Sequence, residues 1–185
     1  MNLPKSWVEQ ILQLKSIHLE LQCCFQISYT QSCAGSIINN RSILSAGHCY
    51  HETNAANWRI RVGSTWANSG GVVFRTELRI VHPNYNRFTL DNDIAIVRVS
   101  GTIVYGLSVA PASIAGTNYK IPDNESVWAI GWGRIYHGGP SSETLQQVEV
   151  WTINHELCRD RYATVGREVT ETMLCSGWLD VGGRD

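Results

Sequence analysis

The chain has 185 residues, of which 43% are hydrophobic and 17% are charged, and its formal net charge is −1. This composition is typical of a compact folded domain and excludes a disordered chain. A charge near zero without a basic run argues against nucleic acid as a partner. No apolar stretch approaches the roughly 18–20 residues that cross a bilayer, so no membrane association is expected.

The first 22 residues differ in pattern from the rest of the chain. Ser6 and Glu9 form a capping box ahead of a short apolar run, which predicts a short amphipathic helix. Charged residues interrupt every apolar run here, so the segment has no signal-peptide core. Apolar and polar residues then alternate over 19–29, which predicts a strand, and a slip at Cys23 and Cys24 predicts a bulge or a break.

Short segments rich in strand-forming residues follow, with clusters of turn residues between them. The predicted strands are Gly35–Ile38, Ser42–Ser45, Trp58–Val62, Gly71–Ile80, Ile94–Val99, Ser126–Gly131 and Gln146–Thr152. Residues 153–162 are predicted to form one short helical turn. Residues 111–126, where Ala, Pro, Gly, Ser and Asn gather, are predicted to connect two β lobes. Many short strands separated by turns are typical of an all-β sandwich or barrel.

Six cysteines point to an oxidising, extracellular compartment. Two pairs enclose short loops of a size that a disulfide would close, with a stabilisation of roughly 3 kcal/mol for each. These pairs are Cys33 with Cys49 and Cys158 with Cys175. The alternative is that they are free, buried cysteines acting as small hydrophobic residues. Cys23 and Cys24 have no assigned partner.

A histidine and an aspartate stand beside two of the predicted strands. His48 follows one strand, and Asp93 immediately precedes another. An imidazole oriented by a buried carboxylate is the base that activates a weak oxygen nucleophile. Three alternatives exist. His48 could be a structural histidine, or it could form a metal site with Cys49 and His51. Asp91 and Asp93 could be acids that only form turns before a strand. The metal reading lacks a second cluster with zinc-like spacing.

From Ser32 onward the chain resembles the trypsin/chymotrypsin-like serine proteases, in particular the insect-type trypsins. The matching segments, in family order, are Ser32–Ile37, Leu44–Cys49, His82–Tyr85, Asp91–Val97, Gly131–Gly133, Met173–Cys175 and a Gly-rich turn that leads to Asp185. The resemblance covers roughly residues 30–185. It implies an all-β fold of two antiparallel β-barrels with an active site between them.

The resemblance also implies the roles of particular residues. His48 is expected to be the general base and Asp93 the group that orients it. Asp185 aligns with the floor of the primary specificity pocket, where a carboxylate selects Arg or Lys through charge-assisted hydrogen bonds. The implied disulfides are Cys33–Cys49 and Cys158–Cys175.

The chain departs from the family pattern in three places. The Gly-Asp-Ser-Gly-Gly segment is absent, and with it the nucleophilic serine and the oxyanion-hole amides. The Ile-Val-Gly-Gly-like activation sequence is absent from residues 1–31. The last strands of the second barrel are also missing, so that barrel is expected to be truncated. The expected divisions are an atypical segment over 1–22, a first lobe over 23–110, a connector over 111–126 and a partial second lobe over 127–185.

These observations predict a serine-type endopeptidase of the trypsin-like type, extracellular and monomeric, that cleaves proteins or peptides after Arg or Lys. Protein protease inhibitors are possible partners. The chain without its serine is expected to be inactive. A non-catalytic homologue acting as a binding or regulatory module is the alternative, and an unrelated β-sandwich adhesion or carbohydrate module is a third reading. No cofactor or metal is expected. The resemblance implies that residues 63–79 correspond to the loop of carboxylates that holds calcium in vertebrate-type members of the family, and this stretch offers only Glu77 as an acidic ligand.

Overall fold

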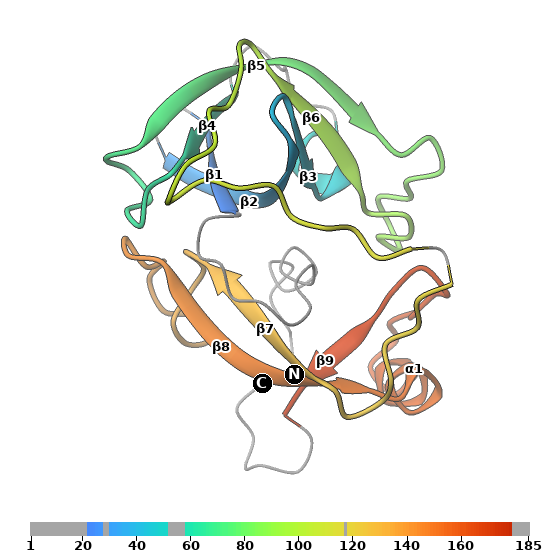
Figure 1. The fold of residues 1–185 in the computed structure, drawn as a ribbon. Helices are drawn as coiled ribbons and strands as arrows, with labels where there is room; N and C mark the ends of the chain where they lie inside the picture. The colour runs from blue at the N-terminus through green and yellow to red at the C-terminus, as the bar shows by residue number, and fades with distance from the viewer. Residues whose placement is uncertain (1–21, 28–29, 52–57, 117, 179–185) are drawn as a thin grey trace.

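The computed structural model describes residues 22–27, 30–51, 58–116 and 118–178. These residues form two β lobes, one above the other in Figure 1, joined by an extended stretch that runs between them. The first lobe is a closed barrel and the second is a three-stranded sheet. The helix predicted near the start of the chain and the pocket residue Asp185 lie outside the described residues.

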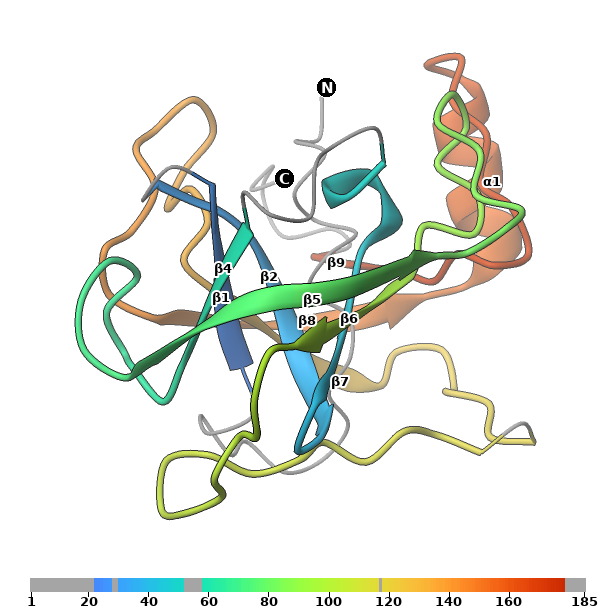
Figure 2. The same ribbon diagram turned by 90° about the horizontal axis from the view of Figure 1, so that it is seen from above.

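Six antiparallel strands close the first lobe into a barrel, in the order β1-β2-β3-β6-β5-β4, and β4 pairs back onto β1. Their curvature around a common centre is visible in both views (Figures 1 and 2). The strands are β1 (Gln22–Ile27), β2 (Thr30–Asn39), β3 (Ser42–Ser45), β4 (Trp58–Val62), β5 (Val72–Val81) and β6 (Ala95–Val99). Closure leaves this sheet without unpaired edges.

Alternating side chains fill the barrel. In β4, Trp58, Ile60 and Val62 are buried, whereas the intervening Arg59 and Arg61 are partly exposed. β6 repeats this alternation, because its first, third and fifth residues are buried and the other two are exposed. Successive side chains of a strand point to opposite faces, so this period of two places an apolar face inside and a polar face outside. The barrel core is therefore encoded locally.

The second lobe consists of the antiparallel strands β7 (Ser126–Gly131), β8 (Gln146–Ile153) and β9 (Cys175–Gly177), in that order, and the helix α1 (His155–Ala163). Asn154 caps α1, since its side-chain oxygen accepts the backbone N–H of Leu157 at 3.1 Å. No helix among the described residues has the length and apolar character needed to cross a bilayer.

Two barrel loops reach the second lobe, at opposite sides of the molecule in Figure 1. The loop between β4 and β5 does so through backbone hydrogen bonds from Ala67 to Glu143 and from Leu145 to Thr65, each 2.8 Å long. The Trp132 indole N–H also donates to the Thr65 carbonyl at 2.9 Å. The loop between β5 and β6 makes the second connection, which lies beside the candidate site.

The all-β prediction is confirmed, and three details of the sequence interpretation were wrong. The helical turn is a nine-residue helix. The register shift between β1 and β2 lies between Phe25 and Gln26 and not at the two adjacent cysteines. Strand β9 was not predicted, because a three-residue strand is too short to show alternation and is defined only by its pairing with β8.

Candidate active site

His48 and Asp93 meet because their strands are neighbours in the barrel. β3 pairs antiparallel with β6, and Ser45 at the end of β3 lies opposite Ala95 at the start of β6. His48 follows β3 in the short 3₁₀ turn Gly47–Cys49, and Asp93 precedes β6 by two residues. In an antiparallel pair, the end of one strand and the start of its partner share an edge. Two residues 45 positions apart in sequence are therefore brought together.

The Asp93 carboxylate holds His48 through both of its oxygens. Oδ1 accepts the His48 backbone N–H at 2.7 Å, and Oδ2 lies 2.6 Å from Nδ1 of the imidazole. The Asp93 side chain is only 3% exposed, whereas that of His48 is 25% exposed. An ionised carboxylate only accepts hydrogen bonds, so Nδ1 carries the proton and Nε2 carries the lone pair. The imidazole is thus held as a base that is oriented on one side and accessible on the other.

Gly47 allows the turn that carries His48 to lie against this carboxylate. A Cβ atom at position 47 would stand 3.2 Å from Asp93 Oδ1, 3.2 Å from a Val81 methyl group and 3.3 Å from the Ile94 carbonyl oxygen. Such contacts are tighter than ordinary van der Waals separations, so a larger residue would need its neighbours to shift. The absence of a side chain here brings the turn close to the carboxylate.

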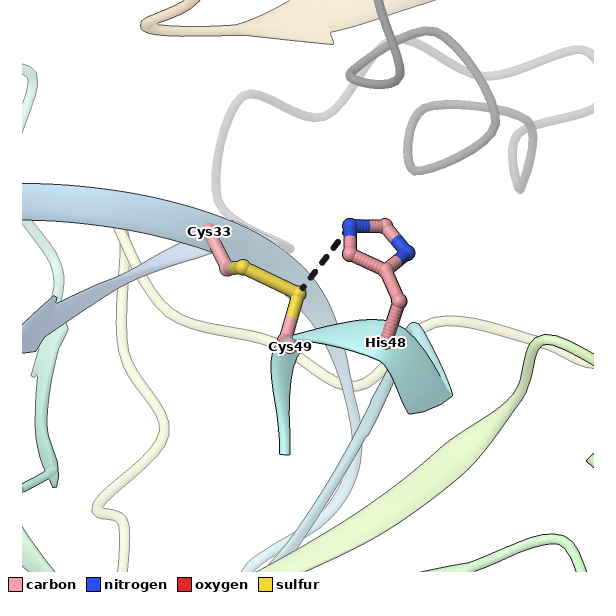
Figure 3. Close-up of side chains that lie close together, drawn as sticks. All are labelled: Cys33, His48 and Cys49. Carbon is pink, nitrogen blue, oxygen red and sulfur yellow. Dashed lines mark hydrogen bonds between the residues drawn. A yellow bond between two sulfur atoms is a disulfide. The ribbon is translucent and has the colours of Figure 1, made fainter. Parts of the chain in front are cut away.

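A disulfide supports the turn from the other side. Cys33 on β2 is bonded to Cys49, with their Cα atoms 6.5 Å apart, and both residues are buried. Figure 3 shows the imidazole of His48 beside this bridge, with Nε2 3.8 Å from the Cys49 sulfur. The three residues cluster as metal ligands would. However, a disulfide has no thiolate to offer, so the cluster does not provide the two sulfur ligands of a zinc site.

Removing this bridge is expected to destabilise the barrel. The double variant Cys33→Ser/Cys49→Ser should lose about 3 kcal/mol of unfolding free energy, because the cross-link restricts the unfolded chain. Urea denaturation measures the change. The variant Cys158→Ser/Cys175→Ser is the matched control, since that bridge closes a loop of nearly the same length, with a sequence separation of 17 against 16. A loss below about 1 kcal/mol in the first variant would contradict the entropic account.

Two further ionisable groups lie around the couple. Burial and, after it, the negative charge of Asp93 raise the pKa of the Tyr85 hydroxyl, while Arg87 opposes the shift. The ring of Tyr85 packs edge-on against His51, with centroids 5.3 Å apart. Hydrogen bonds from the hydroxyls of Thr170 and Thr172 are the main cause that lowers the pKa of the Asp91 carboxyl. Tyr85 therefore remains neutral, and Asp91 remains charged, at neutral pH.

The structure distinguishes between the residues that the sequence singled out. Asp93, and not Asp91, contacts His48. Cys158 on α1 is bonded to Cys175 at the start of β9. Asp185 lies outside the described residues, so its place relative to His48 remains a prediction.

Sequence reasoning missed the partners of Asp91. Thr170 and Thr172 of the second lobe donate hydrogen bonds to it, although they stand 79 and 81 positions away. Threonines in a polar loop carry no distinguishing pattern. No signal in one sequence could have found them.

A closed antiparallel barrel that presents a histidine oriented by a buried aspartate, beside a second β lobe, defines the class of two-lobed serine proteases. The family model for trypsin matches residues 15–185. The chain is 58% identical to Trypsin CFT-1 of Choristoneura fumiferana, over 86% of this chain and 62% of that protein. It is 56% identical to Trypsin, alkaline A of Manduca sexta, over 85% of this chain and 62% of that protein. This chain belongs to the trypsin family.

A solved structure shares the fold at much lower identity. It is described as the scabies mite inactivated protease paralogue S-D1, and it matches with a TM-score of 0.80 and 17% identity, over 85% of this chain and 68% of that one. This likeness supports the fold alone. The chain spans less than two thirds of the length of Trypsin CFT-1 and Trypsin, alkaline A.

Proposed function

We propose that this chain carries the proton-accepting residues of a serine endopeptidase, with His48 as the general base and Asp93 as its orienting carboxylate. The observation that carries the proposal is the 2.6 Å contact between Nδ1 of His48 and Oδ2 of Asp93, in which the carboxylate is almost completely buried. Membership of the trypsin family supports it.

The geometry suits proton transfer to and from a serine hydroxyl. Nε2 accepts the proton as the hydroxyl attacks a peptide carbonyl, and the imidazolium that forms is stabilised by the Asp93 charge beside Nδ1. Because the carboxylate is shielded from water, its attraction for the imidazolium is stronger than it would be in solvent. The same imidazolium then protonates the leaving amine. Asp93 keeps its negative charge throughout, and His48 carries the proton.

The substrates in this proposal are proteins and peptides with Arg or Lys before the cleaved bond. Asp185 would supply the negative charge that binds these side chains. The alignment of the Gly-rich segment before Asp185 with the family, and the names of the insect trypsins above, support this specificity. Protein protease inhibitors would bind at the same site, and the proposed state of the protein is a monomer. The two bridges Cys33–Cys49 and Cys158–Cys175 favour an extracellular protein.

The proposed organisation of the chain follows the family. Residues 23–110 would form the first lobe, 111–126 the connector and 127–185 part of the second lobe, with 1–22 as a segment of different character. The described strands are compatible with these divisions, because the barrel ends with β6 and the second sheet begins with β7.

A second candidate is a non-catalytic homologue that uses its surface for binding. The scabies mite protein, described as an inactivated protease paralogue, has the same fold, so the fold by itself does not require activity. The oriented His48 and Asp93 favour the first candidate, since a binding module has no chemical need for that couple.

The 185-residue chain alone is expected to hydrolyse no Arg or Lys amide, because these residues do not include the segment that carries the nucleophilic serine in the family. In contrast, Trypsin CFT-1 whose aligned segment is replaced by the matching residues of this chain should cleave after Arg and Lys and not after Phe or Leu. Chromogenic amides of these four residues measure both results. Turnover by the isolated chain that a serine-directed inhibitor blocks would refute the first expectation. An inactive but folded replacement protein would favour the non-catalytic candidate.

A further inference from the structure

The loop that presents Asp93 has an unfavourable backbone conformation. Leu90 and Asn92, on either side of Asp91, have positive φ angles of 62° and 54°. This left-handed region is unfavourable for residues other than glycine, more so for Leu90 than for Asn92, because asparagine tolerates it better. Within the loop, the Asn86 N–H donates to the Asp91 carbonyl at 3.0 Å. A strained conformation persists only when its surroundings hold it. Bonds within the loop, including that from the Leu90 N–H to the Asn86 carbonyl at 2.7 Å, contribute to this, and contacts from outside the loop add to them.

Those contacts come from the second lobe. Both threonine hydroxyls, of Thr170 and Thr172, donate to Asp91 Oδ1 at 2.5 Å. The Thr172 hydroxyl also accepts the backbone N–H of Asn92 at 3.2 Å, and the Asn92 side-chain amide donates to Asp91 Oδ2 at 3.0 Å. We refer to Asp91, Asn92, Thr170 and Thr172 as the Asp91 clamp.

The clamp is anchored on both sides. Thr170 and Thr172 lie between α1 and β9, and the Cys158–Cys175 disulfide joins these two elements. On the barrel side, the Asn92 side chain also donates to the Asn84 carbonyl at 3.2 Å, and the Ile94 N–H donates to the Asn92 carbonyl at 2.8 Å. The second of these bonds, from Ile94 to Asn92, spans Asp93. A shift of the clamp therefore moves the backbone from which the Asp93 carboxylate projects.

The hydrogen bonds of the clamp involve an ionised carboxylate, so they connect the two lobes over a wide range of pH. Hydrogen bonds to an ionised carboxylate are shorter and stronger than those between neutral groups. The threonine hydroxyls lower the pKa of Asp91, and the nearby His82 acts in the same direction. A lowered pKa means that the stabilising effect is complete above the ordinary Asp value of about 3.9 and is lost as pH falls through the lowered value. The clamp is therefore intact at neutral and alkaline pH.

We propose that Asp91 is a positioning residue, through which Thr170 and Thr172 of the second lobe hold Asp93 in place under His48. The inference rests on the proposed function, since it gives Asp93 the orienting role. The second lobe would thereby determine how often the His48–Asp93 hydrogen bond in the first lobe opens. Neither Asp91 nor the two threonines touch the reacting atoms, so their effect is indirect.

The test is made on the ¹⁵N-labelled 185-residue chain by NMR, with the exchange rate of the His48 Nδ1–H proton with water as the readout. Thr170→Val/Thr172→Val removes both hydroxyls at nearly constant volume and should speed this exchange by at least about threefold, because the bond opens more often. Thr170→Ser/Thr172→Ser keeps the hydroxyls and should restore the original rate. Thr76→Val is the control, since the Thr76 hydroxyl is buried without a hydrogen-bond partner.

Urea denaturation of the same variants separates positioning from general stability. If the valine pair lowers the unfolding free energy while the His48 Nδ1–H exchange stays at the original rate, Asp91 is only structural and the inference is wrong. Should the valine pair fail to fold, Asp91→Asn keeps the size of the side chain, removes its charge and should speed the exchange in the same direction. Failure to do so would equally overturn the inference.

Asp93→Asn distinguishes this inference from the proposed function. If Asp93→Asn changes the His48 Nδ1–H exchange rate and the clamp variants do not, the inference fails and the function stands. If Asp93→Asn leaves this rate unchanged, the oriented couple does not exist in solution, and both fail.

Discussion

Replacement of Asp93 by asparagine is expected to lower kcat, and with it kcat/KM, by about 10⁴-fold, as this change does in serine proteases whose histidine is oriented by an aspartate. The measurement uses Trypsin CFT-1 carrying the matching segment of this chain, with an Arg amide as substrate. Asparagine fits the space, but its amide nitrogen is a donor and cannot accept the imidazole N–H if it faces Nδ1. The imidazole is then held in the wrong tautomer, with its proton on Nε2, and cannot act as a base.

The burial of Asp93 makes this the largest functional effect expected. Its side chain is 3% exposed, and both oxygens are engaged by His48. Asp160→Asn in the exposed part of α1 is the matched control and should leave kcat/KM unchanged. A loss smaller than about tenfold for Asp93→Asn would mean that His48 does not depend on this carboxylate, and the assignment of the couple would be withdrawn.

Replacement of Trp132 by alanine should cost about 3–5 kcal/mol of unfolding free energy, a large effect on stability for one side chain. Trp132 is 1% exposed and packs with Ala67 and Leu145 between the barrel and the second lobe. Its indole N–H also donates to the Thr65 carbonyl across the same boundary. Removing the ring leaves a cavity at the place where the two lobes meet, and the Thr65 carbonyl keeps only the hydrogen bond from the Leu145 N–H.

Urea denaturation measures this effect, and two variants divide it into its parts. Trp132→Phe keeps most of the apolar volume and loses the hydrogen bond, so a cost of about 1 kcal/mol is expected from that bond alone. Trp66→Ala, in the loop between β4 and β5 that Trp132 contacts, removes a ring that is 49% exposed and should cost much less than Trp132→Ala. Equal losses for Trp66→Ala and Trp132→Ala would show that burial between the lobes is not the source of the stability.

The two connections between the lobes have different chemistry. At the side of Trp132 the connection is apolar, with backbone hydrogen bonds around it. At the side of Asp91 it is polar and includes a charge. Apolar packing stabilises without requiring one orientation of the groups in contact. A hydrogen bond requires a particular distance and angle between donor and acceptor. The polar connection lies next to Asp93, whose orientation the proposed function requires.

The sequence by itself determined the fold class, the family and most of the barrel strands. Alternation with a period of two is a local property, so Trp58, Ile60 and Val62 could be assigned to one face without knowledge of their neighbours. The segments around His48 and Asp93 were recognisable because each stands beside a strand, in the order found in the family. Turns and caps, such as Asn154 at the start of α1, are also encoded within a few residues.

Which side chains meet depended on the folded structure. Turn-forming acids before a strand do not by themselves show which of Asp91 and Asp93 contacts His48; the family resemblance predicted Asp93, and the pairing of β3 with β6 brings it there. The bonds from Thr170 and Thr172 to Asp91 span 79 and 81 positions. The physical reason is that local pattern reports which face of an element is buried, whereas the distance between elements depends on the packing of the whole chain. One sequence carries the first kind of information and not the second.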